Sequence, residues 1–99
     1  MADGEVLVFR EEMTISREAF LRSLPAAVGH EPFEVAGDAI RHRGAERSWR
    51  ITLAPLPDLR LGLLALPRHQ VCIHVEGYGE AERQRFLDRF ELHFRRAGG

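Results

Sequence analysis

Cys72, His74 and Glu76 stand at alternate positions of one short segment, and their side chains are of types that carry chemistry. A thiolate, an imidazole and a carboxylate can together hold zinc, or they can supply a nucleophile and its base. On a β-strand the three side chains would share one face at intervals of about 6.6 Å. Zinc ligands must lie within roughly 4 Å of one another, and a nucleophile must reach its base within hydrogen-bonding distance. A regular strand offers neither arrangement, so we predict no metal ligands, no catalytic residues and no cofactor.

Arginine is the other residue type that could bind a ligand, because all 14 basic residues are arginine and none is lysine. Its planar guanidinium group recognises carboxylate and phosphate. Several arginines and one histidine have the alternation that would place them on the outer face of a predicted sheet, and they form the candidate ligand-binding set: Arg41, Arg43, Arg50, Arg60 and His74. A small anionic molecule or a nucleic acid could bind there, whereas cross-strand ion pairs with acidic neighbours would explain the same charges without a ligand: Glu34, Asp38 and Glu76.

Charge and composition narrow the range of partners. The formal net charge is −1, so no overall field attracts nucleic acid or an anionic membrane. The aromatic platform on which bases stack is missing, because Tyr78 falls at the end of a predicted strand and Trp49 has the parity of the buried face. Residues 1–9 hold acidic side chains and only four consecutive apolar ones, which is typical of neither a signal peptide nor a membrane span. With a single cysteine, we expect a cytoplasmic protein with no membrane or nucleic-acid partner.

The elements that must position these residues are strands. Between Ser48 and Tyr78, apolar residues recur at every second position, which is the period of a β-strand with one buried face. Prolines in 55–58 and 67–69 indicate connections, because proline cannot donate to a central ladder. The segment is therefore predicted to form three antiparallel strands. Trp49 should be the largest side chain of their buried face.

Two further strands and two helices complete the prediction. The apolar run Glu5–Arg10 indicates a first strand, and residues 33–43 indicate a second one that contains a bulge at Gly37-Asp38. Ser16 is a suitable N-cap for a first helix that ends near Gly29. After residue 79 the period changes to about 3.6, which predicts a helix over 80–96. The residues expected on the buried stripes of the helices are Phe20, Leu24, Ala27 and Val28, then Phe86, Leu87, Phe90 and either His93 or Phe94.

The predicted fold is a single α+β domain over residues 1–99. Its order is β-α-β-β-β-β-α, with a five-stranded, mainly antiparallel sheet and both helices packed on one face. In element order and length this layout resembles one half of the saddle fold of the TATA-box-binding protein. The resemblance covers the whole chain without a shared motif, so it implies a fold and no function.

One face of the predicted sheet keeps apolar residues that the helices cannot cover. The first strand is apolar on both faces, and a single helix layer can bury only one of them. Leu64 and Leu66 have the parity opposite to the other leucines of their run. Because grouped apolar residues on a solvent face mark partner surfaces, the predicted partner surface comprises Leu7, Phe9, Leu64 and Leu66.

The sequence therefore predicts a small non-enzymatic interaction domain. No phosphate-binding loop, nucleophile elbow or metal-binding motif is present in the chain. We expect a homodimer or a complex with a protein partner, formed through the outer sheet face or the edge of the first strand. The alternative is a small-molecule or nucleic-acid binder that uses the arginine-rich face.

Overall fold

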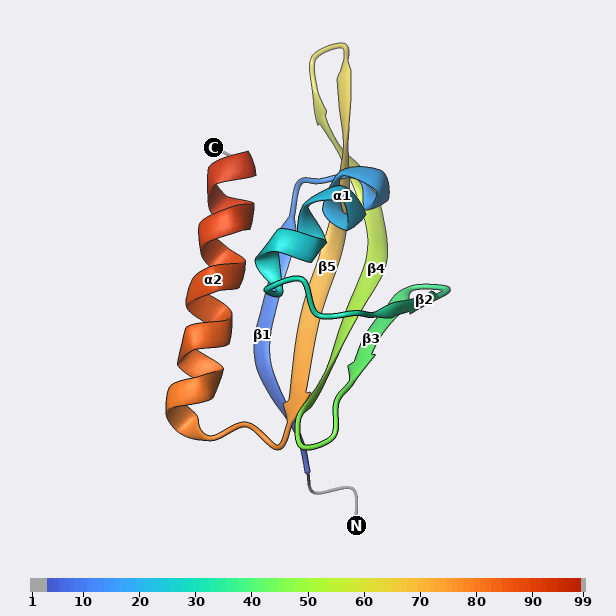
Figure 1. The fold of residues 1–99 in the computed structure, drawn as a ribbon. Coiled ribbons are helices and arrows are strands. Elements are labelled where there is room, and N and C mark those ends of the chain that lie inside the picture. Colours follow the sequence, from blue (N-terminus) through green and yellow to red (C-terminus); the bar gives the residue numbers. More distant parts are fainter. Residues whose placement is uncertain (1–3, 99) are drawn as a thin grey trace.

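The structure is a computed structural model, and it describes residues 4–98. The strands form one antiparallel sheet of order β1-β5-β4-β3-β2, and both helices lie on the same face of it (Figure 1). The predicted α+β fold and element order are confirmed. In chain order the elements are β1 (Glu5–Met13), α1 (Arg17–Ala27), β2 (Glu34–Ala36), β3 (Ala39–Arg43), β4 (Ser48–Leu61), β5 (Leu64–Glu76) and α2 (Glu80–Gly98).

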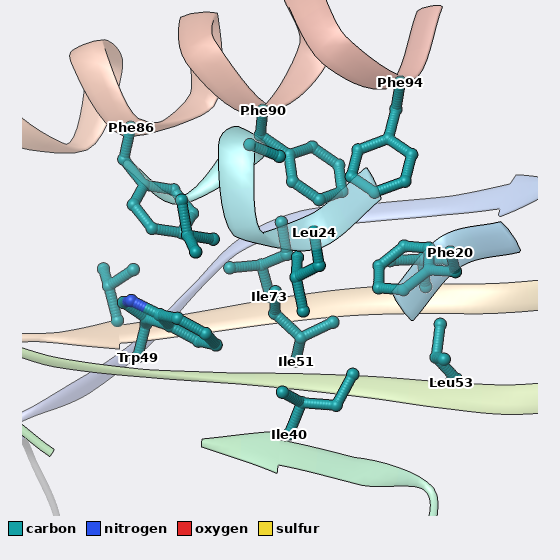
Figure 2. Packing of buried hydrophobic residues seen from close by; sticks show 14 residues of the cluster. Phe20, Leu24, Ile40, Trp49, Ile51, Leu53, Ile73, Phe86, Phe90 and Phe94 are labelled. Carbon is teal, nitrogen blue, oxygen red and sulfur yellow. The ribbon is translucent and has the colours of Figure 1, made fainter. Parts of the chain in front are cut away.

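The core lies between the sheet and the two helices. Trp49 is only 2% exposed and is the largest of the fully buried side chains, as predicted. Figure 2 shows the aromatic rings of α2 pointing toward the sheet, where they meet the side chains of α1 and of β3, β4 and β5. Phe94 occupies the buried stripe of α2, and His93 is only half-buried. No helix within residues 4–98 has the length and hydropathy needed to cross a membrane.

The predicted bulge at Gly37-Asp38 is wrong, because these two residues form the turn between β2 and β3. Gly37 has a φ of 62° and Asp38 has no positive φ, which matches a two-residue hairpin turn of type II′. The turn is fixed from outside, since the Arg17 guanidinium donates to the Gly37 carbonyl at 2.7 Å and the Leu53 amide donates to the Asp38 carbonyl at 2.8 Å. Residues 33–43, which were predicted to form one strand, therefore form a hairpin of two strands, β2 and β3.

The predicted connections at 55–58 and 67–69 are also wrong, because β4 and β5 continue through their prolines. The Leu53 amide donates to Asp38, on the edge of β4 that faces β3. In a strand, the backbone nitrogens of alternate residues point to the same edge. The nitrogen of Pro55 therefore points to the edge of β4 that β3 has already left. By the same alternation Pro67 faces the edge of β5 beyond the end of β1. Neither proline interrupts the ladder between β4 and β5.

The predicted three strands are consequently two long ones, joined by a two-residue turn at Gly62-Leu63. Gly62 takes the left-handed conformation that this turn requires, with a φ of 61°. β1 pairs with β5 only over residues 69–76, and β3 pairs with β4 only over residues 48–52. Residues 55–68 therefore project beyond the sheet as a two-stranded hairpin, here called the arm, which stands at the top of Figure 1.

A register shift in β1 separates two residues that were expected to share a face. Leu7 pairs with His74 and Phe9 pairs with Ile73, so Val8 is an extra residue in β1. Leu7 consequently lies on the outer face. Phe9 turns to the helix side, where its ring meets the ring of Phe90 edge-on with 5.1 Å between the centroids. The expectation that Leu7 and Phe9 form one outer surface is wrong for Phe9.

Candidate functional site

The face of the sheet opposite the helices gathers most of the predicted ligand-binding set. The register places Arg41, Arg50 and His74 in one row across β3, β4 and β5. Arg43 follows in the next row, where it lies beside Ser48. Adjacent strands are about 4.8 Å apart, so the side chains of this group are neighbours, as the alternation predicted.

Arg60 does not join them. It lies in the arm, ten residues beyond Arg50 in sequence, which corresponds to about 33 Å along β4. A register shift between Leu56 and Leu59 adds one residue to β4, and this shift reverses the face on which the following side chains lie. The inclusion of Arg60 in the set is therefore wrong.

A shallow cavity of 460 Å³ opens among the grouped residues. In it Arg50 makes a two-pronged ion pair with Glu5, since its Nε donates to Oε2 at 3.1 Å and its Nη2 donates to Oε1 at 2.8 Å. These hydrogen bonds lower the pKa of Glu5 and raise the pKa of Arg50. Arg50 is thus held within the sheet. The cavity, here called the basin, is lined by Glu5, Arg41, His42, Arg43, Ser48, Trp49, Arg50 and Glu76.

The lowered pKa of Glu5 predicts a pH dependence of stability. A carboxyl group whose pKa is depressed in the folded state contributes stability above its unfolded pKa, near 4.5, and this contribution is lost as the pH falls through the folded value. Both partners are partly solvated, so we expect Glu5→Gln to cost no more than about 1 kcal/mol near neutral pH. Urea unfolding should show this loss near pH 7 and a smaller loss near pH 3. A loss of equal size at both pH values would contradict the assignment of the ion pair.

The other two arginines of the basin differ from Arg50, because neither forms an ion pair with a described residue. Arg41 and Arg43 are exposed, and no carboxylate of the described residues lies within ion-pairing distance of either. Glu34 stands opposite Arg41 in the register without forming a bridge, and Asp38 pairs with Arg17 at 3.5 Å. The cross-strand ion pairs expected for this face are therefore not formed. Because Arg41 also faces Arg50 across the strands, two like charges stand opposite each other.

The Cys72, His74 and Glu76 side chains alternate along the outer face of β5, as predicted. No three His, Cys, Asp or Glu side chains within the described part of the chain come close enough to hold a metal ion. His74 lies between Leu7 of β1 and Arg50 of β4. Its Nδ1 atom is enclosed and has no hydrogen-bond partner among residues 4–98. Cys72, His74 and Glu76 therefore form a row along β5 and not a cluster.

A second group of candidate residues lies on the arm. Residues that face each other across an antiparallel pair share one side of the sheet. We call the side of the arm that carries the pairs Leu59-Leu66 and Leu61-Leu64 the leucine face. Leu61 is 54% exposed, Leu64 is 60% exposed, and Leu63 at the tip is fully exposed. The expectation that Leu61 and Leu64 lie on opposite sides is wrong, because a turn separates them.

The predicted partner residues do not form one patch. Leu7 is 47% exposed on the outer face opposite His74. Leu64 lies ten residues from His74 in sequence, which corresponds to about 33 Å along β5. Leu66 belongs to the leucine face and is half-buried at the root of the arm. Only Leu64 and Leu66 remain together as candidates for a shared contact surface.

A third group of candidate residues lies near the start of α2, and its polar side chains are paired with one another. Arg47 pairs with Glu82, and its guanidinium lies 5.7 Å from the centroid of the Tyr78 ring. Burial raises the pKa of Tyr78 to about 12. The Nε1 of Trp49 donates to Glu31 at 2.8 Å. The Arg47–Glu82 pair holds the start of α2, and the hydrogen bond from Trp49 holds Glu31, so these contacts account for the polar side chains without a ligand.

Comparisons with protein-family models, curated proteins and solved structures found no match to this chain. The resemblance to one half of the TATA-box-binding protein saddle is therefore one of element order.

Proposed function

We propose that this chain is a small, non-enzymatic binding domain that self-associates through the leucine face of its arm. The observation that carries the proposal is the exposed pair Leu61 and Leu64 on a hairpin that no other described element covers. An isolated two-stranded hairpin is only marginally stable in water. Grouped apolar side chains on a surface mark contact sites. A second copy of the chain would cover these leucines and support the arm.

The edges of the arm favour contact through its face. Pro55, Pro57 and Pro67 have no backbone N–H, and the alternation turns the nitrogens of Pro55 and Pro67 toward the free edges. Proline on an edge discourages pairing with another strand. The outer face of the main sheet is rich in charge, so it offers less apolar area than the arm. We therefore assign the contact to the leucine face.

Light scattering at increasing protein concentration tests this proposal. Full burial of a leucine contributes roughly 1.5–3 kcal/mol, and part of this gain is offset by the entropy of association. A dimer in the micromolar range is expected, so the average mass should rise from 11.3 kDa toward twice that value. A mass of one chain at every concentration up to roughly 1 mM would remove the proposal.

A second candidate function, the binding of a small anion in the basin, is favoured by one observation. Arg41 and Arg43 lie beside Ser48 and have no acidic partner among the described residues. Guanidinium groups and a hydroxyl group are suitable donors to phosphate or carboxylate. An anion held there would also relieve the repulsion between Arg41 and Arg50.

Calorimetric titration with inorganic phosphate tests the second candidate. Arg41→Gln/Arg43→Gln should abolish binding, because it removes both free guanidinium groups. The control Arg22→Gln/Arg85→Gln removes the same charge from exposed positions on the two helices and should bind like the unaltered protein. Equal weakening by both variants would indicate a general charge effect and would contradict a site in the basin.

We also propose a cytoplasmic setting, which is supported by the presence of a single cysteine. The partner that we propose is a second copy of the chain. A different protein that covers the same leucines is the alternative, and the mass measurement distinguishes the two.

A further inference from the structure

We infer that self-association is reciprocal, with the leucine face of each arm lying in a partly apolar trough of the other chain. This inference rests on the proposed self-association and names the surface that receives the arm. The trough runs from the root of the arm, across the turn between β1 and α1, into the groove between β1 and α2.

The groove between β1 and α2 has a volume of 350 Å³. It exists because β1 is an edge strand and the bulge at Val8 turns Phe9 toward α2. Its rim is charged, with Arg95 lying 3.8 Å from Glu11 and 3.4 Å from Glu91. The apolar side chains that line it are Phe9, Met13, Ile15, Phe90 and Phe94.

A second hollow of 410 Å³ lies at the root of the arm. It is bounded by Leu66 and Pro67 on one side and by the first turns of α1 on the other. Thr14 and Ile15 line both hollows, so the two meet at these residues. Together they form the trough. The apolar side chains of its second hollow are Ile15, Ala19, Leu66 and Pro67, and polar side chains stand among them: Thr14, Ser16, Arg22 and Ser23.

The trough and the arm lie at the same end of the molecule. Met13, the last residue of β1, pairs with His69, and the preceding residue of β5, Arg68, belongs to the arm. In Figure 1 the arm emerges at the end where α1 begins and α2 finishes. The tip of the arm cannot reach its own trough, because the arm continues β4 and β5 in the direction away from the sheet. A two-fold axis at this end would place each arm against the trough of the other chain, and two-fold dimers are the commonest assemblies.

The dimensions agree with a weak dimer. Seven residues per strand give an arm about 23 Å long and about 10 Å wide. One face of such an arm covers roughly 230 Å², and each chain supplies one arm and one trough, so each chain buries roughly 460 Å². The total of roughly 920 Å² for the two chains is in the range of weak, transient complexes, which agrees with the expected micromolar affinity.

Two variants separate this arrangement from arms that pack on each other. Thr14→Arg/Glu91→Arg places two bulky cations in the trough at an exposed and a half-exposed position, outside the core. Leu61→Asp/Leu64→Asp changes only the arm. Circular dichroism checks that each variant is folded, and Thr14→Arg alone replaces the double variant if that one does not fold. The association of each variant, and of their equimolar mixture, is then measured by sedimentation velocity.

In the reciprocal arrangement each variant alone should associate at least about tenfold more weakly than the unaltered chain. The mixture should recover part of the association, because the intact arm of one variant meets the intact trough of the other in one of the two contacts. If the trough variant associates like the unaltered chain while the arm variant does not, the arms pack on each other. The inference then fails and the proposed function stands. If the unaltered chain stays a monomer, both fail.

Discussion

Trp49→Ala is expected to lower the free energy of unfolding by about 3–5 kcal/mol. The indole is buried, and its ring centroid lies 6.0 Å from that of Phe33, 5.7 Å from that of His42 and 6.1 Å from that of Phe86. Truncation would leave a cavity between the sheet and α2. It would also remove the donor that Glu31 accepts from. A domain of this size has a total stability of about 5–15 kcal/mol, so the expected loss is a large part of the total.

Urea unfolding followed by circular dichroism measures this loss, because the variant has no tryptophan to report on its own unfolding. Trp49→Phe is the control, since it keeps an aromatic ring and should lose less stability. In the unaltered protein the single tryptophan should emit at short wavelength and shift to the red on unfolding. A fully solvated emission in the native state would contradict the burial of Trp49.

The buried face of the sheet could be predicted because burial leaves a periodic pattern in the sequence. Ile51, Ile73 and Val75 are fully or almost fully buried, as the alternation indicated. The same alternation predicted that Arg41 and Arg50 lie on the outer face. Side chains of a strand obey this pattern wherever the strand is regular.

The arm could not be predicted from the prolines, because the effect of a proline depends on its neighbours in space. Proline does not fit a central strand, but β4 is no longer central at Pro55, where β3 has ended. Whether the edge that the nitrogen of Pro67 faces is free depends in the same way on where β1 ends. Neither end is visible in the local sequence.

The turns did leave signals in the sequence. Leu63 and Leu64 are consecutive, so the alternation breaks directly after Gly62, and glycine is the preferred first residue of a type II′ turn. Gly37-Asp38 is likewise a hairpin dipeptide. A turn at Gly62 would have placed Leu64 beside Leu61. The bulge at Val8, in contrast, has no glycine or other mark in the sequence, so the inward orientation of Phe9 could be found only from the structure.

Leu61→Asp/Leu64→Asp is expected to weaken self-association by at least about a hundredfold. The two side chains form one exposed cross-strand pair of the leucine face. The change removes apolar area from the contact and would bury carboxylates without partners, which is costly. The arm lies outside the core, so the circular dichroism spectrum should be unchanged. Unfolding of this variant would mean that the leucines support the folded chain itself.

Arg60→Gln/Ala65→Asp is the matched control for that change. Arg60 and Ala65 form the adjacent cross-strand pair, so they lie on the opposite side of the arm. Both double variants lower the net charge by the same amount. A difference between them in association therefore reports the face of the arm and not its charge.

Sedimentation velocity of the unaltered chain and these two variants, from about 1 μM to about 1 mM, tests the central claim most directly. The unaltered chain and the Arg60→Gln/Ala65→Asp control should change with concentration from the sedimentation coefficient of a single 11.3 kDa chain to that of a dimer. The Leu61→Asp/Leu64→Asp variant should need at least about a hundredfold higher concentration to reach the same coefficient. Dimer formation by this variant as tight as that of the unaltered chain, or a single-chain coefficient for all three proteins, would contradict self-association through the leucine face.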